Sequence, residues 1–181
     1  MDLTLTPWRP DLCCRDLSQV PFDKLAERQI VNICLDVDNT LARRDSWQIE
    51  PQLLETLQGA LKAGFIHKLC LLSNIGWGSR RKRRVQQMAA QLGTEYYFAA
   101  RFWEHKPRSL PFRRALHMME AQPAQTAIIG DQLFTDIAGG NKLGLYTILV
   151  RPLGPDHWST RLSGRRLREA RILRALGLEG T

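Results

Sequence analysis

Two kinds of apolar pattern alternate along the chain: short continuous runs, and longer segments in which apolar residues recur every three or four positions. The short runs predict β-strands at 31–35, 68–74, 96–99, 126–130 and 146–150. The longer segments predict helices from Pro51 to near Gly64, from Ser79 to Gly93, after Pro107 and over 134–144. Strands that alternate with helices indicate an α/β protein with right-handed crossovers and a mainly parallel sheet covered on both faces.

The two ends of the chain differ in composition from this central region. Residues 1–29 contain several prolines, and residues 161–174 are dense in arginine with leucines among them. The second segment has the composition of an amphipathic helix on an anionic membrane, and a helix packed on its own domain fits equally well. We therefore predict an N-terminal segment at 1–29 that packs on the core or a membrane surface, one core domain at 30–153, and a basic tail at 154–181.

Composition and charge narrow the setting and the partners. No apolar run is long enough to span a membrane and no signal-peptide pattern is present, so we expect a cytoplasmic protein, with peripheral contact to the inner face of a membrane left open. The 26 Lys and Arg against 18 Asp and Glu give a net charge of +8, which favours nucleic acid, an anionic membrane or a phosphorylated substrate. The four cysteines lack C-x-x-C spacing, so we expect reduced thiols.

Polar residues that can take part in catalysis or ligand binding follow four of the five predicted strands. They are Asp36, Asp38 and Thr40 after the first strand, Ser73 and Asn74 after the second, Lys106 after the third, and Asp131 and Asp136 after the fourth. Ligands of open parallel sheets bind at the carboxyl ends of the strands, so these side chains are expected to share one site. Carboxylates are costly to bury unless they are paired or bound to a metal, which favours a cation among them.

This set of side chains fits phosphoryl transfer. A carboxylate can attack phosphorus and form an aspartyl-phosphate, and a second carboxylate two residues later can protonate the leaving oxygen. Mg²⁺ prefers oxygen ligands such as clustered carboxylates. A hydroxyl and a lysine can neutralise the phosphate oxygens as charge develops. The residues therefore favour phosphoryl transfer assisted by Mg²⁺.

Four segments in order, "DVDNT", "LLSN", "HKP" and "GDQLFTD", resemble the motif set of the haloacid dehalogenase-like (HAD) phosphatases. Within that superfamily, the wording "LDVDNTL" and "IGDQLFTDIAGGNKLG" is similar to the YqeG-like subclass IIIA proteins and the related phosphatidylglycerophosphate phosphatases. The resemblance spans residues 30–152 and implies a three-layer, Rossmann-like HAD fold with a mainly parallel, five-stranded sheet.

The resemblance also implies a role for each residue of the predicted site. Asp36 matches the nucleophile, and Asp38 matches the general acid and base. The metal ligands it implies for Mg²⁺ are the carboxylates of Asp36, Asp131 and Asp136 and the backbone carbonyl of Asp38. The phosphate-binding residues are Thr40, Ser73, Asn74 and Lys106, of which Ser73 and Lys106 also count as catalytic.

The spacing of the motifs predicts that the site has no cap domain. The segments Thr40–Gly76 and Asn74–Lys106 each have room for little more than one helix and one strand. An open site admits a bulky or membrane-embedded phosphomonoester. The resemblance to the phosphatidylglycerophosphate phosphatases implies that the substrate is phosphatidylglycerophosphate, an anionic phospholipid, and the open site and the basic ends of the chain suit such a substrate. A soluble or protein-borne phosphate is the alternative.

The run "RRKRR" carries the most concentrated positive charge in the core region; its members are Arg80, Arg81, Lys82, Arg83 and Arg84. It can be a solvated helix face, or it can bind anionic lipid headgroups, each basic residue contributing about 1 kcal/mol. A nucleic-acid- or ribosome-binding protein on an HAD scaffold is a further alternative. Nucleic acid is disfavoured because no stacking platform or known binding motif accompanies the run. The sequence carries no signal for the oligomeric state.

Overall fold

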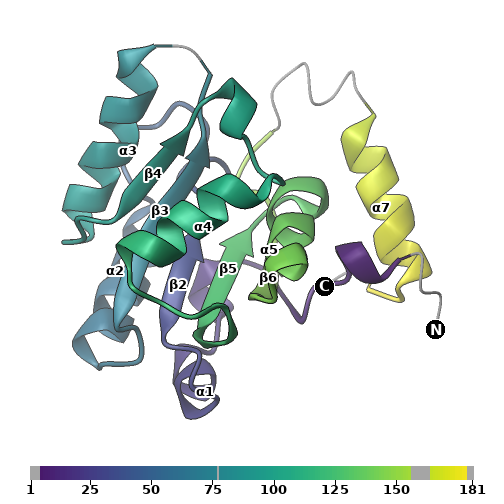
Figure 1. Ribbon diagram of the computed structural model, residues 1–181, viewed down its shortest axis with the longest axis horizontal. Coiled ribbons are helices and arrows are strands. Elements are labelled where there is room, and N and C mark those ends of the chain that lie inside the picture. Colours follow the sequence, from purple (N-terminus) through teal and green to yellow (C-terminus); the bar gives the residue numbers. More distant parts are fainter. Residues whose placement is uncertain (1–4, 77, 156–163, 179–181) are drawn as a thin grey trace.

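Six parallel strands form one sheet in the computed structural model, which describes residues 5–76, 78–155 and 164–178 (Figure 1). The strands are β1 (Leu12–Cys14), β2 (Asn32–Leu35), β3 (Lys68–Asn74), β4 (Tyr97–Ala100), β5 (Thr126–Gly130) and β6 (Tyr146–Val150). Their order is β1-β6-β5-β2-β3-β4, and every pairing is parallel. The predicted parallel α/β sheet is confirmed. Residues 156–163 and 179–181 of the predicted tail lie outside the described residues.

The strand that the sequence did not predict is β1, so the sheet has six strands and not five. β1 has only three residues and begins two positions after Pro10, which leaves too few residues for a recognisable apolar pattern. It pairs with β6 at one edge of the sheet. Asp11 fixes this edge, because its carboxylate accepts a hydrogen bond of 2.8 Å from the Thr147 backbone N–H. Part of the N-terminal segment thus completes the sheet.

Helices connect the strands and cover both faces of the sheet. They are α1 (Phe22–Glu27), α2 (Pro51–Lys62), α3 (Ser79–Gln91), α4 (Ser109–Met118), α5 (Ala138–Leu143) and α7 (Arg165–Ala175). Short helical turns are η1 (Thr6–Trp8), η2 (Leu17–Gln19), η3 (Phe102–Glu104), η4 (Pro123–Gln125) and η5 (Leu133–Ile137). Between β2 and β3 the chain contains a loop and α2, so the site at this end of the sheet has no cap domain there.

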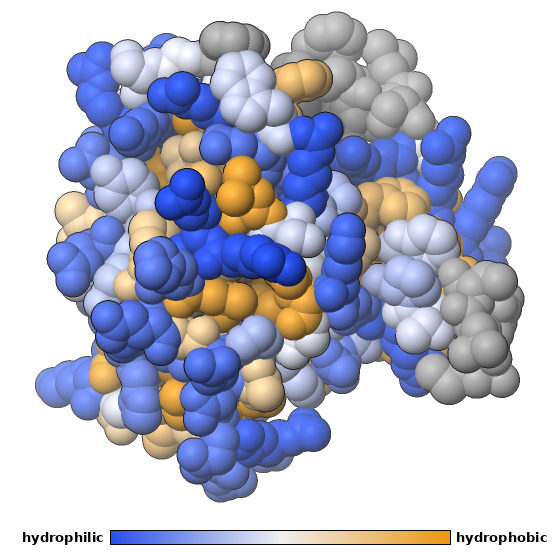
Figure 2. Space-filling model, viewed as in Figure 1, coloured by the Kyte–Doolittle hydropathy of each residue, from blue (hydrophilic) through white to orange (hydrophobic). Residues whose placement is uncertain are grey.

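Alternating residues of the strands build two separate apolar layers. Ile33 and Leu35 of β2 pack in one buried cluster with residues of α1, α2 and α3. Cys34 lies between them in sequence and packs in the other cluster, with Phe112 of α4. Helices α4 and α5 therefore lie on the opposite face of the sheet from α2 and α3, which gives the predicted three-layer arrangement (Figure 1). On the surface, apolar side chains show between charged ones over α4 and α5 (Figure 2).

The strand order reverses at β2, which lies between β5 and β3. In open α/β sheets, such a reversal leaves a crevice at the carboxyl ends of the strands, where ligands bind. The chain leaves β2 through Asp36, leaves β3 through Ile75 and leaves β5 through Asp131. The fold thus places three of the predicted motifs around one point. Among the described residues, no helix has the length and apolar character required to cross a bilayer.

Candidate active site

Lys106 lies between two of the predicted acids. Its Nζ is 2.5 Å from Asp36 Oδ1 and 2.6 Å from Asp136 Oδ1, and it donates a further hydrogen bond of 2.8 Å to the Leu72 carbonyl. The Lys106 side chain is only 2% exposed. Two motifs far apart in the sequence are thereby joined through a buried cation, as the positions of the strand ends predicted.

Asn74 holds the backbone of Lys106 in place. Its Oδ1 accepts a hydrogen bond of 2.8 Å from the Lys106 N–H, and its Nδ2 donates one of 3.2 Å to the Lys106 carbonyl. Next to this pair, His105 Nε2 lies 2.8 Å from the Ile75 carbonyl. The Asn74 side chain therefore positions the lysine, and its predicted contact with phosphate stays a prediction.

Three carboxylates converge where a cation could bind. Asp36, Asp131 and Asp136 each offer one oxygen, and these oxygens lie within 4.8 Å of one another. All three residues are buried. Asp131 Oδ1 is enclosed and has no hydrogen-bond partner among the described residues. An oxygen-only ligand set with a free buried carboxylate oxygen fits Mg²⁺.

Gly130 makes room for one of these acids. A Cβ atom at this position would overlap the side chain of Asp136, which folds back from η5 over the end of β5. The Asp136 carboxylate also accepts hydrogen bonds from the Gln132 backbone N–H at 3.3 Å and from the Thr135 hydroxyl at 3.2 Å. The "GDQLFTD" segment therefore turns tightly enough to return its second acid to the same site as its first.

The electrostatics of the cluster favour a bound cation. Burial raises the pKa of Asp36 to about 7, although the Lys106 charge opposes the rise. Burial and the neighbouring Asp36 carboxylate hold the pKa of Asp131 well above its usual value. Burial alone would lower the pKa of Lys106, but the Asp136 and Asp36 carboxylates outweigh it and raise that pKa. Negative charge is thus in excess, and a metal would relieve it.

Asp38 pairs with Arg84 and is not one of the three clustered carboxylates. Arg84 donates a hydrogen bond of 2.7 Å to Asp38 Oδ1, one of 2.5 Å to the Ser46 carbonyl and one of 3.4 Å to the Arg43 carbonyl. Arg84 is only 6% exposed. Its predicted place in an exposed basic surface is therefore wrong, because this arginine points from α3 to the loop after β2; the other four members of the run are exposed.

The two predicted hydroxyls are buried at the same end of the sheet. Thr40 and Ser73 are each 1% exposed. The Thr40 hydroxyl has no hydrogen-bond partner among the described residues. Ser73 lies in the last part of β3, in register with Ala99 of β4. Their roles in binding phosphate stay predictions.

Arg166, which the sequence reasoning missed, reaches the carboxylate triad from α7. It forms an ion pair with Asp131 Oδ2, donates a second hydrogen bond to the Asp131 carbonyl, and donates a third of 2.9 Å to Glu169 Oε2. Burial raises the pKa of Glu169. Nothing in the arginine-dense tail distinguishes Arg166 from its neighbours, so only the fold could reveal it.

Apolar contacts hold α7 beside the site. Ile172 and Leu173 pack against a small buried cluster of Leu133, Ile137 and Leu149. Figure 1 shows α7 at the side of the molecule, near η1. The described part of the tail therefore packs on its own domain through these contacts and through Arg166.

The comparison with protein families decides the identity. Residues 6–153 match the model of the mitochondrial PGP (phosphatidylglycerophosphate) phosphatase family. The chain belongs to this family. As a HAD-superfamily member of the PGP phosphatase family, it is a phosphatase, a hydrolase of phosphoric monoesters. The predicted superfamily, subclass relationship and enzyme class are confirmed.

Individual relatives support the assignment of this chain to the PGP phosphatase family. It is 36% identical over 172 residues to "Probable phosphatase YqeG" of Bacillus subtilis, covering 94% of this chain and 92% of that protein. It is 29% identical over 144 residues to "Phosphatidylglycerophosphate phosphatase 1, chloroplastic" of Chlamydomonas reinhardtii. That match covers 80% of this chain and 53% of the algal protein, so this chain aligns with about half of the algal protein.

Solved structures share the fold. The crystal structure of an HAD phosphatase from Thermococcus onnurineus superimposes with a TM-score of 0.52 at 13% identity, covering 74% of this chain and 98% of that one. At this identity the likeness concerns the fold alone. It confirms the Rossmann-like HAD architecture of the PGP-family phosphatase.

Proposed function

We propose that this phosphatase is a Mg²⁺-dependent enzyme that forms an aspartyl-phosphate on Asp36. The observation that carries the proposal is the placement of Lys106 between Asp36 and Asp136, with Asp131 completing a carboxylate triad. A nucleophilic carboxylate needs a cation beside it that can bind the oxygens of the phosphoryl group. Lys106 supplies that cation, and the triad supplies the oxygen ligands for a metal.

The proposed reaction has two steps. Asp36 attacks phosphorus, and the bond from phosphorus to the leaving alcohol breaks while Asp38 gives a proton to the leaving oxygen. Asp38, now ionised, then takes a proton from water, and the oxygen of that water attacks the phosphorus bonded to Asp36. The bond between phosphorus and the Asp36 oxygen breaks, which releases phosphate and restores both carboxyl groups. Lys106, Ser73 and Thr40 bind the phosphoryl oxygens throughout.

The carboxylates of Asp36, Asp131 and Asp136, with the Asp38 backbone carbonyl, would hold the Mg²⁺ ion. When bound, the ion supplies positive charge that offsets the charge of the phosphoryl group. Lys106 keeps Asp136 and Asp36 at a fixed separation, since it contacts both. The chain thus prepares the ligand set with its own residues.

Phosphatidylglycerophosphate is the proposed substrate. The support comes from the family, from the algal relative that carries this activity in its name, and from an end of the sheet without a cap domain. The net charge of +8 suits an anionic lipid and peripheral contact with a membrane. A soluble phosphomonoester is the second candidate, because the same open site admits one.

A substrate panel tests the proposal. The purified protein is assayed for phosphate release with Mg²⁺ on phosphatidylglycerophosphate in mixed micelles, and on sugar and nucleotide phosphates. We expect the lipid to be hydrolysed far faster. Equal or faster release from a soluble phosphate would reject the lipid assignment. Asp36→Asn should abolish turnover with an unchanged circular dichroism spectrum, and full activity in that variant would reject the mechanism.

A further inference from the structure

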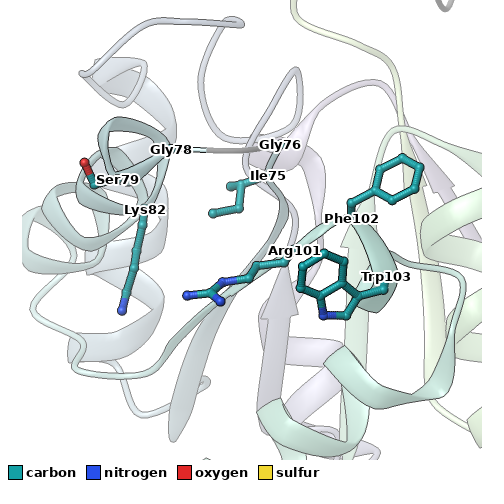
Figure 3. Close-up of a pocket in the computed structure, with 8 residues that line it drawn as sticks. All are labelled: Ile75, Gly76, Gly78, Ser79, Lys82, Arg101, Phe102 and Trp103. Carbon is teal, nitrogen blue, oxygen red and sulfur yellow. The ribbon is translucent and has the colours of Figure 1, made fainter.

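A pocket opens beside the proposed phosphate site, on the side of β3 and β4 (Figure 3). Its volume is about 360 Å³, and its wall includes Ile75, Lys82, Arg101, Phe102 and Trp103. These residues come from the end of β3, from the first turns of α3 and from the connection after β4. None of them belongs to the carboxylate triad or to the phosphate-binding set.

Short backbone links join this pocket to the catalytic lysine. Ile75 follows Ser73 and Asn74, and its N–H donates a hydrogen bond of 2.8 Å to the Ala100 carbonyl. The His105 ring lies 2.8 Å from the Ile75 carbonyl, and Lys106 is the next residue. A ligand whose phosphate lies at Lys106 therefore has the pocket as its immediate neighbour.

The outer edge of this pocket exposes large apolar side chains. Phe102 is 69% exposed and Trp103 is 51% exposed. The other exposed large apolar residues of the described chain are Phe65, Leu110 and Leu167, and none of them lines this pocket. Clustered exposure of this kind marks an interaction site more often than single exposed residues do.

Cationic side chains accompany these aromatic rings. Lys82 and Arg101 are exposed, and Arg101 extends across the pocket toward the side of α3 that carries Lys82 (Figure 3). Arg108 is also exposed and donates a hydrogen bond to the Trp103 carbonyl. Aromatic rings that enter the headgroup region, next to cations that meet lipid phosphates, form the combination that binds an anionic bilayer surface.

We propose that this aromatic edge, made of Lys82, Arg101, Phe102 and Trp103, docks the enzyme on an anionic phospholipid bilayer. The proposal rests on the proposed lipid substrate and deepens it. Phe102 and Trp103 enter the interface, and Lys82 and Arg101 contact headgroup phosphates. Because the pocket adjoins Lys106, the lipid's terminal phosphate reaches Asp36 while its acyl chains stay in the membrane. The exposed cations of Lys82 and Arg101 suit a diffuse anionic surface, which favours a membrane over a protein partner.

Vesicle sedimentation with matched variants tests the docking surface. The test variant is Arg101→Glu with Trp103→Ser. The control is Lys62→Glu with Phe65→Ser, which exchanges the same kinds of residue beside the start of β3, at the opposite end of that strand from the site. The full-length protein is mixed with EDTA and with vesicles of phosphatidylcholine, with or without phosphatidylglycerol. We expect the wild type and the control to bind only the anionic vesicles. The test variant should bind these vesicles at least about tenfold more weakly.

Three results would overturn the docking surface: no binding by the wild type, equal binding to uncharged vesicles, or equal binding by the test and control variants. Hydrolysis of p-nitrophenyl phosphate should be unchanged in both variants, which shows that the catalytic centre is intact. Turnover of phosphatidylglycerophosphate should fall in vesicles but not in detergent micelles for the test variant. If the wild type binds anionic vesicles but does not hydrolyse this lipid, the proposed substrate fails and the docking surface stands.

Discussion

The guanidinium of Arg84 lies 2.7 Å from a carboxylate oxygen of Asp38, and it also donates hydrogen bonds to the Ser46 and Arg43 carbonyls. The contact links α3 to the loop that follows β2. Asp38 has 29% of its side chain exposed, so it faces solvent while one of its oxygens is fixed. Arg84 therefore sets where the proposed general acid stands relative to the buried Asp36.

Replacing Arg84 should weaken proton transfer. Arg84→Gln removes the guanidinium that fixes Asp38 Oδ1, so the general acid loses its position and we expect kcat on an alkyl phosphate to fall about 10- to 100-fold with a small change in KM. p-Nitrophenyl phosphate has a leaving group that needs little protonation, so its kcat should fall much less. Steady-state kinetics on both substrates measures the difference.

The neighbouring arginine offers a matched control for this experiment. Arg83 is exposed and its side chain contacts Ser79 in the same helix, so Arg83→Gln should leave both rates unchanged. Arg84→Lys should restore part of the alkyl-phosphate activity because it keeps the charge. Equal losses on the two substrates would mean that Arg84 acts on the fold and not on Asp38.

Removal of Lys106 should destabilise the protein and stop catalysis. Lys106→Met leaves the buried Asp36 and Asp136 without their shared cation, and breaking a buried pair costs about 3–5 kcal/mol. Urea unfolding in EDTA measures this loss. Lys62→Met is the control, because Lys62 is exposed in the last turn of α2; it should cost less than about 1 kcal/mol. Equal losses in the free energy of unfolding for the two variants would contradict the role of Lys106 as the buried cation between Asp36 and Asp136.

The pH dependence of stability in the absence of metal follows from Asp36. Burial raises its folded pKa to about 7, above the unfolded value of about 4, so between these values the folded state holds a proton that the unfolded state has lost. This contribution to stability is fully present below about pH 4 and is lost as the pH rises through about 7. Urea unfolding in EDTA across this range should show the decline, and Asp36→Asn should lack that part of it.

Metal binding should show the opposite trend with pH. Because a ligating carboxylate must lose its proton, the rise in Tm on adding Mg²⁺ should be larger near pH 8 than near pH 5.5. Asp36 and Asp131 both have raised pKa values through burial, so both contribute. Thermal unfolding with Mg²⁺ and with EDTA at each pH measures the difference. A Mg²⁺ effect that does not change with pH would argue against these ligands.

The sequence predicted the site's main residues because each of them lies next to a local pattern. Apolar runs located β2, β3, β4, β5 and β6 to within one residue, and polar groups in the loops that follow such strands lie at one edge of a parallel sheet. Burial at that edge follows from the same rule. Asp36, Lys106, Asp131 and Asp136 were therefore placed together correctly.

Other features depend on contacts that no local pattern encodes. Arg84 and Asp38 are 46 positions apart, and Arg166 and Asp131 are 35 apart. Within "RRKRR" all five side chains look alike, and only the packing of α3 on the core decides that Arg84 is buried. β1 has only three residues, too few for an apolar pattern, and its place in the sheet depends on its backbone pairing with β6.

Arg166 should tune metal affinity, because its guanidinium pairs with a carboxylate that is also a proposed metal ligand. A fixed positive charge beside the site repels a divalent cation and competes for Asp131. Arg166→Gln should therefore bind Mg²⁺ several-fold more tightly at about pH 8, where the protons on the acids compete least. The Mg²⁺ concentration that gives half-maximal phosphatase activity, and the Tm rise at fixed Mg²⁺, both measure this.

Arg168 provides the control for the helix itself. It lies in α7 and is exposed, so Arg168→Gln removes the same charge without touching Asp131 and should leave Mg²⁺ affinity unchanged. If Arg166→Gln instead weakens Mg²⁺ binding, Arg166 orients the Asp131 carboxylate more than it repels the ion. Equal effects of the two variants would mean that the net charge of α7 matters and the Arg166–Asp131 contact does not.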